Sequence, residues 1–138
     1  MMTETAPQGA LQGMRILAVE DQPDLRDMLQ ALLEQQGATV TGCESAFQAF
    51  SVLVSGEPFD VAVFDISMPG EDGLALVARL RQWESRKAPD HLPVIALTAH
   101  VSQDMRRRCE AAGFDHFLPK PIVPGTLSRT IRKLTRDA

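Results

Sequence analysis

Five polar residues each follow an apolar segment, and their types are those of a site that handles a phosphoryl group. They are Glu20, Asp21, Asp65, Thr98 and Lys120. Three carboxylates held together repel one another unless a cation joins them, and their hard oxygens suit Mg²⁺ better than a transition metal. A lysine and a hydroxyl would donate hydrogen bonds to anionic oxygens. Together, a carboxylate nucleophile, a divalent metal, a lysine and a hydroxyl are the parts of a phosphoryl-transfer site.

The stretch around Asp65 shows how such a residue could reach a site. An apolar run over residues 61–64 stops at this carboxylate, and a proline and two glycines then favour a turn. A short continuous apolar run is typical of a strand that is buried on both faces. Taken alone, Asp65 could equally begin an ordinary turn, and Thr98 could be a strand-end hydroxyl bonded to backbone. Because all five residues stand at strand ends, the pattern favours a functional site over unrelated turn residues.

The apolar spacing alternates between strand and helix along the chain. Strands are expected at residues 14–20, 38–43, 61–64, 91–99 and 114–120. Apolar residues three, four and seven positions apart predict a helix after each strand. Ser45 is a candidate N-cap, and Gly37 and Gly113 stand where two of the helices should end.

Five strand–helix units with apolar strands predict one α/β domain, in which helices cover both faces of a parallel sheet. In the doubly wound order 2-1-3-4-5, the first and third strands flank the point where the strand order reverses, and ligands bind there outside the carboxyl ends of the strands. Glu20, Asp21 and Asp65 should therefore converge. We place the folded domain at residues 14–138 and expect residues 1–13 to be a flexible tail.

Composition limits the classes of function. With a net charge of −4 and a pI near 5.3, the chain is unlike an electrostatic nucleic-acid binder. No apolar run approaches the roughly 18 residues of a membrane span, and the first residues lack the basic and apolar regions of a secretory signal. Cys43 and Cys109 are interpreted as free thiols in a reducing compartment, with a disulfide as the alternative. We therefore expect a cytoplasmic protein.

Four segments in order, each at a strand end, resemble a receiver domain of bacterial two-component signalling, with the flavodoxin-like fold of the CheY-like superfamily. They are ILAVEDQPDLRDML, DVAVFDISMPGEDGL, PVIALTAH and AAGFDHFLPKPI, and the similarity covers residues 14–136. Such receivers are the phosphoacceptor half of a histidine-to-aspartate phosphorelay. The segment RRRCEAAGFDHFLPKPI is more similar to receivers attached to hybrid histidine kinases than to those of transcription factors. Because the chain opens with methionine and its own tail, we favour a stand-alone receiver over a relay shuttle or an excised domain.

The resemblance implies roles for the residues at the expected site. Asp65 would be the phosphoacceptor that attacks a phosphohistidine of a partner. Mg²⁺ would be held by the side chains of Glu20, Asp21 and Asp65, together with the backbone carbonyl of Ser67. Lys120 would pair with the phosphoryl group and offset its charge.

The resemblance also implies how a signal would leave the site. Thr98 resembles the switch hydroxyl that moves toward the phosphoryl group, and Phe117 stands at the aromatic position that rotates inward with it. By itself, Phe117 would simply be a core residue. The Lys120–Pro121 bond is cis in the family, which only an X–Pro bond adopts at low cost.

Partners and activity follow from the same resemblance. It implies a signalling domain rather than an enzyme, with Mg²⁺-dependent self-phosphorylation from small phosphodonors and self-dephosphorylation. The expected phosphodonor is a sensor histidine kinase or a histidine phosphotransfer protein. The expected output is a downstream protein target that contacts the fourth helix, fifth strand and fifth helix, or a phosphorylation-dependent homodimer. No direct contact with nucleic acid or with a membrane is expected.

Three other functions share parts of this pattern. A flavodoxin-like cofactor binder would need a phosphate loop rich in Ser, Thr and Gly after the first strand, where this chain has the acidic EDQPD. A phosphatase of the haloacid dehalogenase kind would have a second aspartate two residues after the nucleophile, at Ser67, and a cap that 138 residues hardly allow. A receiver-fold adaptor that acts without phosphorylation stays open, although the five intact polar residues argue against it.

Cationic runs occur in the last two predicted helices. They are MRRRCE at residues 105–110, and Arg129, Arg132, Lys133 and Arg136. Such runs are typical of solvated helix faces, and the alternative is a docking surface for a protein partner. His100, two residues after the switch threonine, could influence the lifetime of a phosphoryl group or could simply be exposed.

Overall fold

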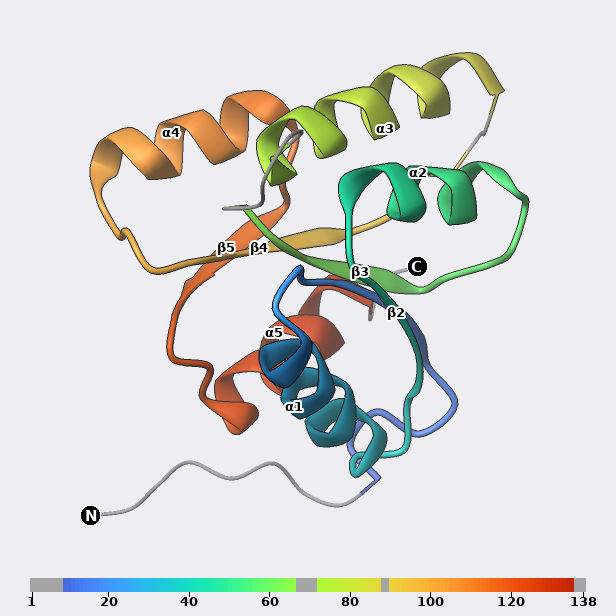
Figure 1. Cartoon of the computed structure of the whole chain (residues 1–138), viewed down its shortest axis with the longest axis vertical. Helices are drawn as coiled ribbons and strands as arrows, with labels where there is room; N and C mark the ends of the chain where they lie inside the picture. Colours follow the sequence, from blue (N-terminus) through green and yellow to red (C-terminus); the bar gives the residue numbers. More distant parts are fainter. Residues whose placement is uncertain (1–8, 67–71, 88–89, 136–138) are drawn as a thin grey trace.

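The computed structural model describes residues 9–66, 72–87 and 90–135, in which five strands alternate with five helices (Figure 1). The strands are β1 (Arg15–Val19), β2 (Thr39–Cys43), β3 (Val61–Asp65), β4 (Val94–Thr98) and β5 (His116–Pro119). The helices are α1 (Pro23–Glu34), α2 (Ala46–Val54), α3 (Gly73–Lys87), α4 (Gln103–Ala112) and α5 (Pro124–Thr135). All paired strands are parallel, in the order β2-β1-β3-β4-β5. The predicted fold class, strand order and five helices are confirmed.

Two apolar cores lie on opposite faces of the sheet. Figure 1 shows α2, α3 and α4 over one face and α1 and α5 over the other. Leu17 and Val19 of β1 belong to the core beneath α2, α3 and α4, whereas Ile16 and Ala18 belong to the core beneath α1 and α5. Strands β3 and β4 are buried along their whole length, which is why their sequences are almost continuously apolar.

The first described residues differ from the flexible tail expected over residues 1–13. Residues 9–13 form turns, and the Leu11 side chain is fully buried in the core beneath α1 and α5. The backbone N–H of Leu11 also donates a hydrogen bond to the carbonyl of Gln36 at 2.8 Å. The folded part of the chain thus begins before the predicted boundary. Residues 1–8 lie outside the described residues.

The sequence predicts free thiols at both cysteines and no contact with a membrane. Cys43 and Cys109 are both free, as predicted, and both are buried. Burial raises the pKa of the Cys43 thiol to about 11, so this thiol is protonated and unreactive at neutral pH. In the part of the chain that the structure describes, no helix combines the length and apolar character needed to cross a bilayer.

Candidate functional site

The three acidic residues predicted to hold a metal meet at the carboxyl ends of β1 and β3. Glu20 and Asp21 follow β1, and Asp65 is the last residue of the neighbouring β3. One carboxylate oxygen from each residue lies within 4.8 Å of the other two. Glu20 and Asp65 are buried, whereas Asp21 is partly exposed. A hard divalent cation fits this all-oxygen donor set, because three close carboxylates are destabilising without a compensating charge.

Lys120 joins the two buried carboxylates. Its Nζ lies 3.2 Å from Asp65 Oδ1 and 3.4 Å from Glu20 Oε1. Burial acts to lower the pKa of Lys120, but Asp65 and Glu20 outweigh that effect and raise the pKa above its ordinary value. Burial raises the pKa of Glu20, and the charge of Asp65 acts in the same direction. The two carboxylates thus stabilise the charged form of Lys120.

The loop after β1 is held by hydrogen bonds that the sequence did not indicate. The backbone N–H of Gln22 donates to Glu20 Oε2 at 3.2 Å. Arg26, on α1, donates from Nη1 to the backbone carbonyl of Glu20 at 2.9 Å and makes a longer contact of 3.4 Å with the carbonyl of Asp21. Because Arg26 binds backbone oxygens, it orders the acidic loop without using up the carboxylate oxygens.

Thr98 and Phe117 come to the same side of the sheet, but each has another partner in this structure. Thr98 ends β4, one residue beyond the register partner of Asp65. Its buried Oγ1 accepts a hydrogen bond from the N–H of His100 at 2.9 Å. The ring of Phe117 is half-buried, and the guanidinium carbon of Arg106 lies 4.7 Å from the ring centre. The run of arginines in the sequence of α4 does not by itself predict this cation–π contact.

Backbone geometry beside Asp65 and Lys120 bears on three further residues. The carbonyl of Ser67, predicted as a metal ligand, lies outside the described residues and stays a prediction. The Lys120–Pro121 bond is cis, as the resemblance implied.

Gly73 begins α3, and a Cβ atom there would lie only 2.7 Å from the backbone oxygen of Asp65. Glycine is thus required for α3 to approach the end of β3 so closely, a role that its interpretation as a turn residue missed.

Comparison with known sequences agrees with this geometry. The family described as "Response regulator receiver domain" matches residues 16–132. The chain is also 37% identical over 121 residues to the sensor histidine kinase GacS of Pseudomonas protegens, and the match covers 88% of this chain and 13% of the kinase. The chain therefore spans only a small part of that relative.

Solved structures resemble nearly the whole fold. Chemotaxis protein CheY4 of Vibrio cholerae superposes with a TM-score of 0.79 at 27% identity, covering 88% of this chain and 98% of CheY4. The receiver domain of sensor histidine kinase PA1611 from Pseudomonas aeruginosa, at 28% identity, has the same TM-score, covers 90% and 98%, and holds a magnesium ion in its active-site cleft. Receiver domains bind Mg²⁺ in an acidic pocket and interact with histidine kinases or phosphotransfer proteins. With the strand order, the acidic cluster and the sequence match in agreement, this chain belongs to the response regulator receiver domain family of two-component signalling.

Proposed function

We propose that the chain takes a phosphoryl group onto Asp65 from a phosphohistidine of a sensor histidine kinase or a histidine phosphotransfer protein, and that the reaction depends on Mg²⁺. The observation that carries this proposal is the position of Lys120, whose Nζ contacts both Asp65 and Glu20 at 3.2 and 3.4 Å. The same two carboxylates belong to the cluster with Asp21. A nucleophile, a cationic donor and an oxygen-rich metal site thus share one small volume.

The chemical step follows from the charges. An Asp65 carboxylate oxygen attacks the phosphorus of the donor, so that a P–O bond forms as the P–N bond breaks and the imidazole nitrogen leaves. Lys120 donates hydrogen bonds to the phosphoryl oxygens and offsets their charge. Mg²⁺, when bound by Glu20, Asp21, Asp65 and the Ser67 carbonyl, would supply further compensation of negative charge at the same place. The product is an acyl phosphate on Asp65.

The acyl phosphate then changes the packing on one side of the molecule. Its oxygens compete with the backbone of His100 for the Thr98 hydroxyl, which turns to donate to the phosphoryl group. Phe117 moves into the space that Thr98 leaves, and its ring parts from Arg106. The surface formed by α4, β5 and α5, named the α4–β5–α5 face, is repacked and changes its affinity for a downstream protein.

Intact-protein mass spectrometry after mixing with acetyl phosphate and Mg²⁺ tests the proposal. The wild type should gain one phosphoryl group, and the gain should vanish without Mg²⁺ or in Asp65→Asn. Asp60→Asn is a matched control, because Asp60 lies just before β3, at its opposite end, and it should gain the group normally. If neither acetyl phosphate nor a phosphorylated phosphotransfer protein modifies the wild type, the chain is an adaptor that uses the fold without its chemistry.

A further inference from the structure

Contacts from several elements fix the position of Glu20, the first residue of the acidic cluster. Its backbone N–H donates to the carbonyl of Cys43 on β2 at 3.0 Å, and its Oε2 accepts from the N–H of Gln22 at 3.2 Å. Lys120 Nζ lies 3.4 Å from its Oε1, and Arg26 Nη1 donates to its backbone carbonyl at 2.9 Å. Of these partners, Lys120 and Arg26 act through their side chains, so their contributions can be tested by substitution.

Arg26 differs from Lys120 in the atoms that it binds. Its Nη1, which carries two N–H groups, lies 2.9 Å from the backbone carbonyl of Glu20 and 3.4 Å from that of Asp21. These carbonyls belong to consecutive residues, and the side chains of both residues are in the acidic cluster. Arg26 thus holds the backbone that carries two of the three carboxylates, and the carboxylate oxygens stay available to a cation.

A glycine on the edge strand gives the Arg26 side chain its path. Arg26 is half-buried, and a Cβ atom at Gly42 of β2 would lie 3.6 Å from its Cγ and 3.5 Å from its Cδ. The apolar stem of the arginine therefore packs against β2, while its charged end reaches the loop after β1. Packing of the stem restrains the guanidinium in the absence of any ligand.

We propose that Arg26 is a positioning residue for the metal site, which keeps the carboxylates of Glu20 and Asp21 together and so raises the affinity of the chain for Mg²⁺. This inference rests on the metal site of the proposed function. Close carboxylates repel one another when no cation is bound, so a loop without the hydrogen bonds of Arg26 would let them separate. Binding of Mg²⁺ would then have to reverse that separation. Contacts that orient metal ligands commonly change metal affinity by tenfold or more.

The positive charge of Arg26 acts in the opposite direction. A guanidinium close to the acidic cluster repels a divalent cation. If Arg26 acted on the site through its charge alone, removing it would tighten the binding of Mg²⁺. If Arg26 acts by positioning the loop, removing it weakens the binding. The sign of the change therefore separates the two effects.

Isothermal titration calorimetry of the full chain with MgCl₂, without a phosphodonor, tests the proposal. Arg26→Met keeps an apolar stem against β2 and removes the hydrogen-bond donors, and it should raise the Kd for Mg²⁺ about tenfold. Arg26→Lys should recover part of the affinity, because an ammonium can still donate to a carbonyl. Arg86→Gln, which removes an exposed cation from the end of α3, should bind Mg²⁺ as the wild type does.

Phosphorylation by acetyl phosphate gives a second measurement. In Arg26→Met, the Mg²⁺ concentration that supports half of the maximal rate should rise about tenfold, and excess Mg²⁺ should restore most of the lost rate. Damage to the fold alone would not be reversed in this way. Circular dichroism checks folding, and Arg26→Gln replaces Arg26→Met in both measurements if the methionine variant does not fold.

Unchanged or tighter binding of Mg²⁺ by folded Arg26→Met overturns the proposal. An equal loss of affinity in Arg86→Gln also overturns it, because the effect would then belong to the total charge of the chain. A loss of rate that is as large at saturating as at limiting Mg²⁺ overturns it too, since Arg26 would then act on a step other than metal binding.

The two measurements separate this inference from the proposed function. If the wild type is never phosphorylated but binds Mg²⁺ about tenfold more tightly than Arg26→Met, the proposed function fails and the role of Arg26 stands. If the wild type is phosphorylated in an Mg²⁺-dependent way and Arg26→Met binds Mg²⁺ equally well, only the role of Arg26 fails.

Discussion

The charge balance among Glu20, Asp21, Asp65 and Lys120 determines what the site can accept. One ammonium group faces three carboxylates, and Lys120 contacts only two of them, Glu20 and Asp65, within 4.0 Å. Arg26, the nearby cation on α1, binds the backbone carbonyls instead of the side chains. Among the described side chains, negative charge therefore exceeds positive charge at the carboxyl ends of β1 and β3, and a divalent cation would offset this excess.

Magnesium should stabilise the folded chain through this excess of carboxylates. At a concentration about a hundredfold above its Kd, Mg²⁺ should raise the free energy of unfolding by about 3 kcal/mol. Asp21→Asn removes a ligand without disturbing the ion pairs of Lys120, so it should lose most of that gain, and Asp60→Asn should keep it. Urea unfolding with and without Mg²⁺ measures the difference. Equal stabilisation of Asp21→Asn and the wild type would remove Asp21 from the metal site.

His116 should make stability depend on pH below neutrality. Burial and the charges of Lys133 and Arg106 lower its pKa in the folded state beneath the ordinary value of 6.5. The unfolded chain then binds this proton more readily, so the free energy of unfolding falls as pH drops through 6.5 toward the lower folded pKa. His116→Gln should flatten that part of the urea-unfolding profile, and Lys133→Gln should flatten it partly. If the slope stayed the same in both variants, the pH dependence would have to come from a group other than His116.

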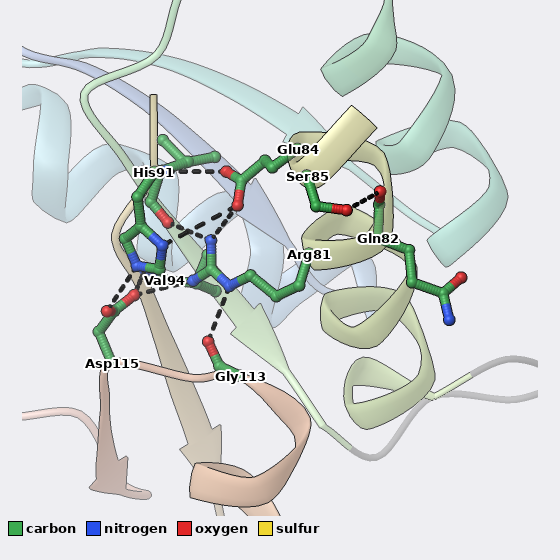
Figure 2. A network of polar contacts seen from close by, with 9 residues as sticks. Arg81, Gln82, Glu84, Ser85, His91, Val94, Gly113 and Asp115 are labelled. Carbon is green, nitrogen blue, oxygen red and sulfur yellow. Dashed lines mark hydrogen bonds and ion pairs between the residues drawn. The ribbon is translucent and has the colours of Figure 1, made fainter. Parts of the chain in front are cut away.

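At the scale of elements, polar contacts join α3 to the end of the sheet that lies opposite the acidic site. Figure 2 shows Arg81 reaching from α3 to Gly113 and Asp115. Its guanidinium donates to the carbonyls of Gly113 at 3.0 Å and Leu92 at 2.8 Å, and pairs with Glu84 at 2.8 Å and Asp115 at 2.9 Å. One side chain thus joins α3 to the segments that enter β4 and β5, and so fixes the base of the α4–β5–α5 face.

Removing Arg81 should therefore cost more than removing an ordinary surface cation. Arg81→Ala leaves two carboxylates and two carbonyls without this donor, and the free energy of unfolding should fall by about 2–3 kcal/mol. Arg81→Lys should restore only part of it, because an ammonium cannot serve four acceptors arranged around a planar fork. Arg86→Ala on the same helix should stay within about 0.5 kcal/mol of the wild type. If urea unfolding gave Arg81→Ala the same small loss of stability as Arg86→Ala, the contacts of Arg81 would contribute nothing to the free energy of unfolding.

The strands, the helices and the acidic cluster could be predicted, because each depends on local pattern or on topology. The N-cap at Ser45 is confirmed by its Oγ, which accepts from the N–H of Gln48 at 3.1 Å. Asp65 and the acidic pair converge because parallel strands present their carboxyl ends at one edge. Arg26, Gly73 and Arg106 were missed, because their partners are backbone atoms or an aromatic ring brought together only by folding. Arg81 and Gly113, 32 residues apart, illustrate the same limit.

At the scale of the whole molecule, the two faces of the sheet are closed in different ways. In the part of the chain that the structure describes, α2, α3 and α4 cover one face of the sheet, whereas α1 and α5 cover the other (Figure 1). The turn at residues 9–13 adds Leu11 to this second core, which also contains Leu29, Leu33 and Val40. A lone leucine among glycine and glutamine gives no periodic signal, which is why the sequence indicated a tail at this end of the chain.

Leu11 should therefore behave as a core residue of the whole domain. Its side chain is 0% exposed, so Leu11→Ala should lower the free energy of unfolding by about 2–4 kcal/mol, through lost burial and the cavity left behind. Gln12→Ala, at the exposed neighbouring position, should change it by less than about 0.5 kcal/mol. Deleting residues 1–13 should cost at least as much as Leu11→Ala, because it also removes the hydrogen bond to Gln36. Urea unfolding of the three variants distinguishes a segment that belongs to the core from a flexible tail. A deletion that left the free energy of unfolding unchanged would make residues 1–13 the flexible tail that their composition suggests.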